Sequence, residues 1–307
     1  MIKTVDLYKE YENTIAVNGI NLEVKNNSVY ALIGPNGAGK TTLIKMIATL
    51  IEQTKGQIFV DNIENINQRK EARAKLGFLP DFFYLYDDLT VNEYLEYFCA
   101  CYLLPKTIHK QRIKEVIEMV NLEIKTNEFI GSLSRGMKQR VGIAKTLLHD
   151  PVLLLLDEPA SGLDPKARID LRNIIKSLQK AGKTLVVSSH ILTELSDFCD
   201  SFGIMEKGVL VKSDNINTIG LDSIHREVRI EVLNNISKTF DLIMNIENVY
   251  EPSIRDNVIN FIFKGSLEEM SEINTYLVNN NIKVTSFFEK KKNIEDLFMQ
   301  YSNNELN

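Results

Sequence analysis

Eight consecutive residues have the types and spacing needed to hold a polyphosphate: Gly34, Pro35, Asn36, Gly37, Ala38, Gly39, Lys40 and Thr41. Glycines let a turn close tightly and point backbone N–H groups at phosphate oxygens, and a following helix adds the positive end of its dipole. A lysine at this spacing reaches the β- and γ-phosphates, and a threonine hydroxyl can ligate Mg²⁺. The segment fits GxxxxGK[ST] and predicts a nucleotide site formed by these residues and Thr42.

A pair of acidic residues, Asp157 and Glu158, follows the apolar run 152–156. Such a run is typical of a central strand of a parallel sheet. A carboxylate where this strand ends, beside the glycine-rich turn, can bind Mg²⁺ directly or through water, which assigns Asp157 to the metal. Glu158 can orient or deprotonate an attacking water. The two segments together predict a P-loop NTPase.

The elements that must position these residues alternate between strands and helices in the first two hundred residues, which predicts an α/β domain. Strands are expected over 28–33, 152–156 and 184–188, and helices over 41–50 and 165–179. The helix over 41–50 is expected to bury one face, formed by Leu43, Ile44, Ile47 and Leu50. Residues 82–149 contain three helical patterns, near 91–101, 110–120 and 135–148, and predict a helical subdomain inserted into the α/β domain.

The polar segment 213–220 predicts a linker, so we expect an ATPase domain over 1–214 and an accessory domain over 215–307. Beyond the linker, strand patterns at 228–232 and 258–263 and one beginning at 282 are interspersed with helical patterns near 236–244 and 267–277. A last helical pattern covers 294–301. This order predicts a small α+β, ferredoxin-like domain, βαββαβ followed by a final helix.

The composition excludes several other classes of protein. With 44% hydrophobic and 25% charged residues, the 307-residue chain has an ordinary globular composition. Its apolar runs are far shorter than the roughly 18–20 residues that span a bilayer, and its N-terminus lacks the apolar segment of a signal peptide. From residue 218 onward 9 Lys and Arg face 14 Asp and Glu, which accounts for the net charge of −5. We therefore expect a cytoplasmic protein that does not bind nucleic acid. The three cysteines and four histidines lack the spacing of a zinc site.

The segment 133–140, LSRGMKQR, resembles the LSGGQ signature of the nucleotide-binding subunits of ABC transporters. Arg135 replaces the first glycine of that signature, and Met137 replaces the glutamine. The resemblance implies that Ser134 and Gly136 contact the γ-phosphate of ATP held by the opposite subunit. Taken alone, a serine at this position is more often the N-cap of the helix that follows.

Other elements resemble the same family in the same order. The segment 161–164, SGLD, is similar to the D-loop, His190 to the switch histidine at the γ-phosphate, and Tyr11 to the aromatic residue that stacks on adenine. A lone histidine after a strand, or an isolated surface tyrosine, is often structural instead. Asp81 stands where the family has a glutamine that contacts the metal, so a metal contact at this position is an expectation with a different side chain.

The resemblance implies an ATPase that uses ATP and Mg²⁺ and works as a head-to-tail dimer, either a homodimer or a heterodimer with a second ATPase subunit. It would power a separate membrane permease and so lie at the inner face of the cell membrane. The segments PDFFYLYDDLT and SRGMKQR, with the separate C-terminal domain, resemble export-type subunits for drugs, antimicrobial peptides or sodium. The aromatic residues of 82–86 are either core or a permease contact. The alternatives are a soluble ABC ATPase of ribosome or DNA repair, which generally carries two cassettes or a long insertion, and a non-hydrolysing regulatory domain.

Overall fold

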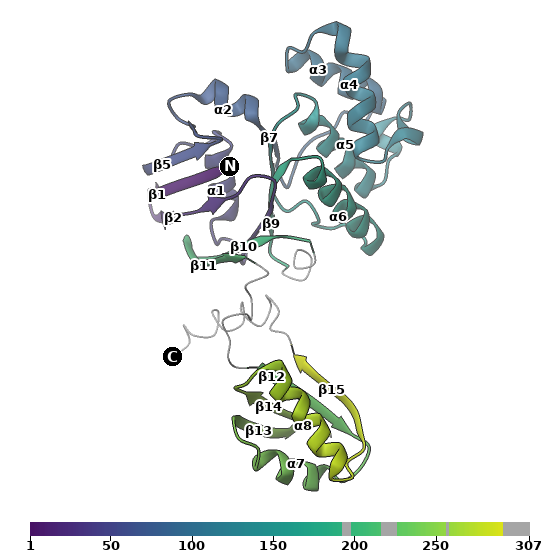
Figure 1. Ribbon diagram of the computed structural model, residues 1–307. Helices are drawn as coiled ribbons and strands as arrows, with labels where there is room; N and C mark the ends of the chain where they lie inside the picture. Colours follow the sequence, from purple (N-terminus) through teal and green to yellow (C-terminus); the bar gives the residue numbers. More distant parts are fainter. Residues whose placement is uncertain (192–197, 216–225, 256–257, 291–307) are drawn as a thin grey trace. The chain divides into compact units, whose positions relative to one another are not determined.

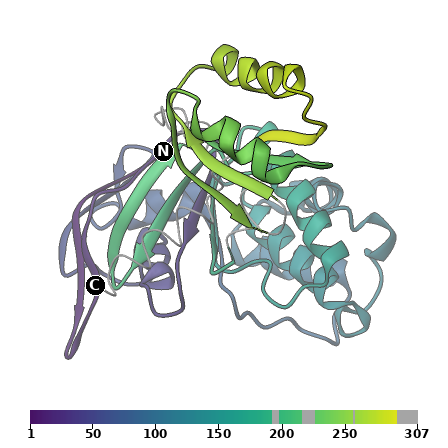
Figure 2. The ribbon, with the colours of Figure 1, turned by 90° about the horizontal axis from the view of Figure 1, so that it is seen from below.

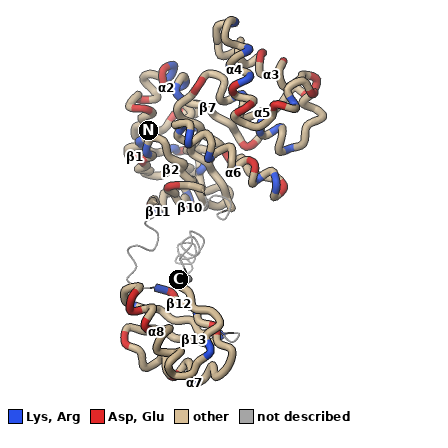
Figure 3. Tube along the Cα trace, turned by 45° about the vertical axis from the view of Figure 1, so that its right-hand side comes forward, with Lys and Arg blue, Asp and Glu red and all other residues tan. Residues whose placement is uncertain are grey.

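A computed structural model describes residues 1–191, 198–215, 226–255 and 258–290 of the chain. These divide into two compact units, Met1–Ile216 and Asn217–Asn307 (Figure 1). Lys and Arg are interspersed with Asp and Glu over both units (Figure 3). Within the described residues, no helix combines the length and apolarity needed to cross a bilayer.

The first unit contains two β-sheets with a helix between them. One sheet is antiparallel and contains β1 (Ile2–Tyr11), β2 (Thr14–Ile20), β3 (Glu23–Val24), β5 (Lys55–Val60) and β6 (Ile63–Glu64). Helix α1 (Lys40–Ile47) buries Leu43, Ile44 and Ile47 in a core shared by both sheets. The short helix α2 (Arg69–Lys75) follows β6.

The second sheet has the order β11-β10-β4-β9-β8-β7, where β4 is Val29–Ile33, β7 Leu76–Leu79, β8 Leu153–Leu156, β9 Thr184–Ser189, β10 Ser201–Glu206 and β11 Val209–Asn215. The strands from β10 to β7 run parallel to one another, and the edge strand β11 runs antiparallel to β10. Helix α6 (Pro165–Lys180) covers the face opposite α1 (Figure 1).

The carboxyl ends of the parallel strands meet at one edge of this sheet. The register aligns Leu79 with Leu156 and Leu156 with Val187, so the residues that follow β7, β8 and β9 gather at that edge.

Between β7 and β8 the chain forms helices α3 (Val91–Cys101), α4 (Lys106–Met119) and α5 (Arg135–Leu147). A capping box of Thr90 and Glu93 begins α3. Each helix lies within a few residues of its expected position. Leu50 differs from the expectation, because α1 ends at Ile47 and Thr49 adopts a left-handed φ of 61°. Leu50 therefore lies beyond the helix and is 56% exposed rather than buried on its face.

The second unit has the order β12 (Arg226–Val232), α7 (Ile236–Met244), β13 (Val249–Arg255), β14 (Val258–Phe263), α8 (Leu267–Asn279) and β15 (Val284–Lys290). The antiparallel sheet order β13-β14-β12-β15 is ferredoxin-like. Both helices pack on one face of this sheet, where Ile243, Ile273 and Leu277 meet the apolar side chains of β12 and β14 (Figure 2). The predicted helix over 294–301 lies outside the described residues.

Candidate nucleotide site

The glycine-rich turn leads from β4 into α1, and its tight course requires glycine at two positions. A Cβ atom at Gly34 would lie 2.2 Å from the carbonyl oxygen of Met205, and one at Gly39 would lie 2.2 Å from that of Ala16. Gly39 also has a φ of 100°, which side-chain-bearing residues rarely adopt. The turn thus brings the first-turn N–H groups of α1, which have no intrahelical acceptors, to the edge of the parallel sheet.

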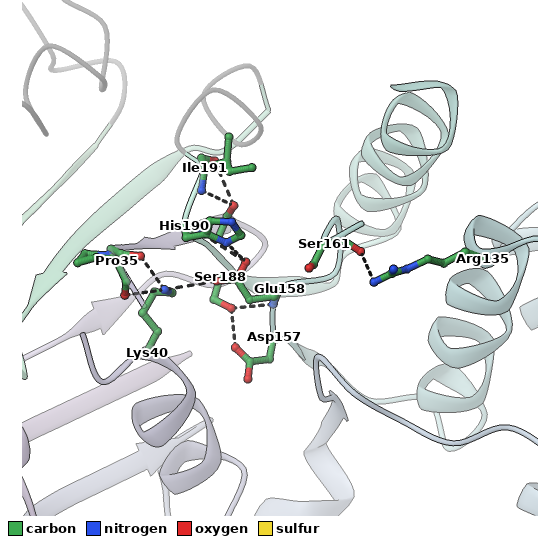
Figure 4. Close-up of polar contacts among 11 residues, drawn as sticks. Pro35, Lys40, Arg135, Asp157, Glu158, Ser161, Ser188, His190 and Ile191 are labelled. Atoms are coloured by element: carbon green, nitrogen blue, oxygen red, sulfur yellow. Dashed lines mark hydrogen bonds and ion pairs between the residues drawn. The ribbon is translucent and has the colours of Figure 1, made fainter. Parts of the chain in front are cut away.

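Lys40 opens α1 and is 5% exposed. Its Nζ donates hydrogen bonds to the carbonyl oxygens of Gly34 (2.6 Å) and Pro35 (3.2 Å). The same nitrogen lies 3.3 Å from Oε1 of Glu158 (Figure 4). The fold therefore brings the predicted phosphate-binding lysine and the predicted general base into direct contact. Thr41 is exposed and Thr42 half-buried in the same helical turn.

Asp157 follows β8 and is almost completely buried, with 1% of its surface exposed. Its Oδ1 accepts a hydrogen bond of 2.7 Å from the hydroxyl of Ser188, and that hydroxyl oxygen accepts one of 2.8 Å from the backbone N–H of Glu158. Sequence analysis missed Ser188. Its one signal in the sequence is a hydroxyl near the end of β9, the strand beside β8, and hydroxyls are common enough in strands that this signal is weak.

Glu158 has a left-handed φ of 48°, a conformation with a typical cost of about 1–3 kcal/mol for such residues at functional sites. The hydrogen bond from its N–H to Ser188 helps to hold this conformation. Its Oε2 lies 2.8 Å from Nδ1 of His190, which follows β9. With Lys40 on one carboxylate oxygen and His190 on the other, the Glu158 carboxylate is held in one orientation (Figure 4).

Asp81 is half-buried beyond the end of β7. Burial raises the pKa of its carboxyl group, and the negative charges of Asp157 and Glu158 raise it further, whereas Arg135 and His190 act in the opposite direction. All four side chains therefore lie close enough to Asp81 to change the pKa of its carboxyl group. The fold therefore places Asp81 in the electrostatic field of the two acidic residues predicted to serve the metal and the water.

The signature segment begins helix α5 on the helical subdomain. The hydroxyl oxygen of Ser134 accepts a hydrogen bond of 3.3 Å from the N–H of Met137, so Ser134 is the N-cap of this helix. A Cβ at Gly136 would lie 2.7 Å from Cβ of Ala167 in α6, which makes glycine necessary for packing within the chain. Both residues thus have a role within their own subunit, and their predicted contact with a partner's nucleotide stays a prediction.

Tyr11 ends β1 and is 47% exposed. The ammonium group of Lys9 lies 5.0 Å from the centre of its ring. An exposed aromatic face in this position is available for stacking, but its described contacts do not include the residues around Lys40. Its role toward adenine likewise stays a prediction.

The donor set of the site fits a nucleotide with a hard cation. Mg²⁺ prefers carboxylate and hydroxyl oxygens and is usually held by one or two carboxylates together with substrate phosphates. Asp157 supplies a buried carboxylate and Thr41 a hydroxyl. In the described parts of the chain, this site included, three or more His, Cys, Asp or Glu side chains do not gather as a metal-binding group. The site therefore suits a metal that arrives with phosphate rather than one held by the protein alone.

The amino-acid sequence is similar to a known family profile and to curated proteins. Residues 17–161 match the sequence profile described as "ABC transporter". The bacitracin transport ATP-binding protein BcrA of Bacillus licheniformis is 34% identical over 98% of this chain and 96% of its own length. The linearmycin resistance ATP-binding protein LnrL of Bacillus subtilis is 34% identical over 73% of each chain.

Solved structures share the fold of the first unit. An ATP-binding subunit of an ABC transporter superposes with a TM-score of 0.63 at 30% identity, covering 72% of this chain and 92% of its own. A bacterial ABC transporter cassette solved as a dimer gives the same TM-score at 28% identity, covering 70% of this chain and 99% of its own. These relationships confirm the expected P-loop ABC cassette. The chain belongs to the family of ABC transporter ATP-binding proteins.

Proposed function

We propose that the chain is the ATP-hydrolysing subunit of an ABC exporter and drives a separate membrane permease. The observation that carries this proposal is the contact between Lys40 and Glu158, at 3.3 Å, beside the glycine-rich turn. This contact joins the group suited to bind phosphate to the group suited to activate water, and places both at the edge where the parallel strands end.

In this proposal the nucleotide phosphates lie along the turn from Gly34 to Thr42 and against the start of α1. Thr41 and Asp157 hold Mg²⁺, with Asp81 near it. The metal, when bound, neutralises phosphate charge and orients the phosphates for attack. Tyr11 stacks on the adenine ring.

Glu158 receives a proton from the attacking water, and its neighbours prepare it for this step. His190 contacts one carboxylate oxygen, so the other can turn to the water when Lys40 moves to the phosphates. Such positioning matters because a general base must lie within hydrogen-bond distance of the proton it removes.

The signature segment completes the site from a second subunit. Ser134 and Gly136 lie at the N-terminus of α5, where backbone N–H groups and the helix dipole favour an anion. One similar cassette was solved as a dimer, and the same protein was also solved in a post-hydrolysis state with ADP and phosphate. These findings support a dimer of cassettes with two ATP molecules between them.

A surface for the permease lies on the helical subdomain and beside it. A cleft of about 560 Å³ is lined by residues that include Arg73, Phe78, Tyr102 and His149. Shortly after β7, Phe82 and Tyr84 are 84% and 97% exposed. Phe82 and Tyr84 therefore do not belong to the core, whereas the half-buried Phe83 packs against Gly142 of α5. Exposed aromatic groups of this kind suit contact with an amphipathic segment of a permease.

The export direction rests on relatives of full length. BcrA proteins of Bacillus licheniformis and Enterococcus faecalis, both named for bacitracin transport, align over 98% and 97% of this chain. This coverage leaves room for little of the C-terminal unit to be unaligned, whereas the solved structures above cover 70–72% of this chain. We propose that the exported compound is of a similar antimicrobial class.

Co-purification tests the coupling to a permease. A tagged chain would be isolated from its cells in mild detergent, and the bound proteins identified by mass spectrometry. We expect a multi-spanning membrane protein as the main partner, and less of it when Phe82 and Tyr84 are both replaced by Ser. Recovery of ribosomal proteins instead would support a soluble ABC ATPase.

Replacing Asp81 by Asn should raise the Mg²⁺ concentration for half-maximal ATPase activity about tenfold, since removing a nearby negative charge weakens attraction to a divalent cation. ATP affinity at saturating Mg²⁺ should change little. Mg²⁺ titrations of the wild type and of D81N give the comparison, with D87N as a control because Asp87 pairs with Lys138 at the protein surface. Identical titrations for wild type and D81N would remove Asp81 from the surroundings of the metal.

Removal of the C-terminal unit should leave nucleotide binding intact. The two units have separate hydrophobic cores, and every predicted site residue lies in the first. A chain that ends at residue 217 should bind ATP with near-native affinity in a fluorescence titration, while dimer stability or transport declines. A folded truncation that no longer binds ATP would show that the C-terminal unit shapes the site.

A further inference from the structure

Arg135 occupies the position where the resembled signature has a glycine, and its side chain makes a specific contact. It is the first residue of α5. Its Nη2 donates a hydrogen bond of 2.9 Å to the carbonyl oxygen of Ser161, which belongs to the turn that follows Glu158 (Figure 4). Hydrogen bonds from a charged donor are stronger than those between neutral groups. A residue that looks like a defect in the signature thus links two segments that are 26 residues apart.

The close packing of Arg135 on Gly162 also supports a link between the signature turn and the Ser161–Gly162 turn. A Cβ at Gly162 would lie 2.3 Å from Nη1 and 2.4 Å from Cζ of Arg135. The guanidinium group therefore occupies the space that any side chain at Gly162 would need. Gly162 has a φ of 65°, so glycine is also favoured there by the backbone.

Two further contacts fix α5 to α6 behind this link. Gly136 packs closely on Ala167, and Arg140 forms an ion pair with Asp170. The side chain of Asp164 caps the start of α6 with a hydrogen bond of 2.8 Å to the N–H of Ala167, so the Ser161–Gly162 turn continues directly into that helix. These contacts join helix to helix, whereas Arg135 joins the signature turn to the Ser161–Gly162 turn.

We infer that Arg135 is a positioning residue that fastens the signature turn to the Ser161–Gly162 turn, so that the signature turn approaches the nucleotide of a second subunit in a fixed position. The inference rests on the proposed function, because the dimer of that proposal brings the signature turn to the nucleotide. The position of the signature turn affects the rate of ATP hydrolysis, because small displacements of groups that contact the reacting phosphate lower kcat strongly.

The test compares R135M with K138M in the full-length chain. Methionine keeps much of the aliphatic stem of Arg135 and removes the guanidinium group. Lys138 is a matched control, since it lies one turn later in α5 and its ammonium pairs with Asp87 at 2.9 Å, away from the Ser161–Gly162 turn. Hydrogen exchange is measured at Ser161 and Leu163, whose amides donate to the carbonyl oxygens of Glu158 and Ala160. The kcat for ATP hydrolysis and the Kd for ATP are measured on the same samples.

We expect R135M to speed hydrogen exchange at Ser161 and Leu163. It should also lower kcat about tenfold, because one charge-assisted hydrogen bond is lost, and leave the Kd for ATP unchanged. K138M should leave exchange and kcat at wild-type values, and R135K should recover part of the loss. Equal exchange in R135M and K138M would overturn the inference. If wild type itself does not hydrolyse ATP, the proposed function fails, while the exchange comparison still decides whether the link exists.

A second variant covers the case in which R135M does not fold. G162A keeps Arg135 but places a methyl group where the guanidinium lies. It should speed exchange at Ser161, and the loss in kcat that G162A causes should be smaller in the R135K background than in wild type if both changes break one contact. Fully additive effects of G162A and R135K would overturn the link.

Discussion

Replacing Glu158 by Gln should lower the kcat for ATP hydrolysis by about 10²–10⁴-fold, the usual contribution of a general base. Glutamine has nearly the same shape but cannot take a proton from water. ATP binding should survive, because Lys40 keeps its hydrogen bonds to the carbonyl oxygens of Gly34 and Pro35, and Asp157 keeps its bond to Ser188. The amide oxygen of glutamine can still accept from His190.

The measurements are steady-state phosphate release and gel filtration with ATP and Mg²⁺. Because ATP is bound but not cleaved, E158Q should accumulate as an ATP-bound dimer where the wild type stays largely monomeric. The matched control is E118Q, a change at an exposed glutamate of α4 that pairs with Lys114. E158Q with the turnover of E118Q would move the role of base to another group.

Replacing Lys40 by Ala should abolish most ATP binding. The change deletes a buried ammonium group aimed at the phosphate turn, and a charge-assisted contact of this kind contributes about 1.5–3 kcal/mol, or roughly tenfold to hundredfold in Kd. The loss in kcat/KM should be larger, because charge develops on the phosphates in the transition state.

A fluorescent ATP analogue measures this loss of binding directly. K45A is the matched control, since Lys45 lies in the last turn of the same helix and away from its N-terminus. Near-UV spectra should match between both variants and wild type. Wild-type affinity and turnover in a folded K40A would refute the assignment of the nucleotide site.

The features that sequence predicted best are those encoded locally. The glycine-rich turn depends on backbone freedom and one lysine at fixed spacing, and β4 and β8 are buried along their whole length, so each reads as an unbroken apolar run. Their order along the chain then places Lys40 and Asp157 at the same edge of the sheet. In the second unit, local patterns likewise indicate β12, β14, β15 and both helices.

Other elements lacked such a signal. The sequence predicts no strand before residue 28, because β1 and β2 mix buried and exposed residues irregularly and their pairing contains bulges. Strand β13 was also not located. It lies at the sheet edge and contains Pro252, which lowers its resemblance to a strand.

Contacts distant in sequence could not be predicted either. Ser188 bonds to Asp157 and to the N–H of Glu158 only because β8 and β9 are neighbours in this register. Arg135 appeared as a departure from the family signature, and its bond to Ser161 depends on the packing of α5 against α6. Both contacts are set by tertiary structure, which residue patterns describe only in outline.

The most direct test of the central claim is phosphate release from ATP by the purified full-length chain, with Mg²⁺ or with EDTA. We predict continuous release with Mg²⁺, release at background with EDTA, and background rates for E158Q under both conditions although that variant still binds ATP. Equal rates with Mg²⁺ and EDTA, or an active E158Q, would contradict the claim that Asp157 and Glu158 serve a metal-dependent ATPase.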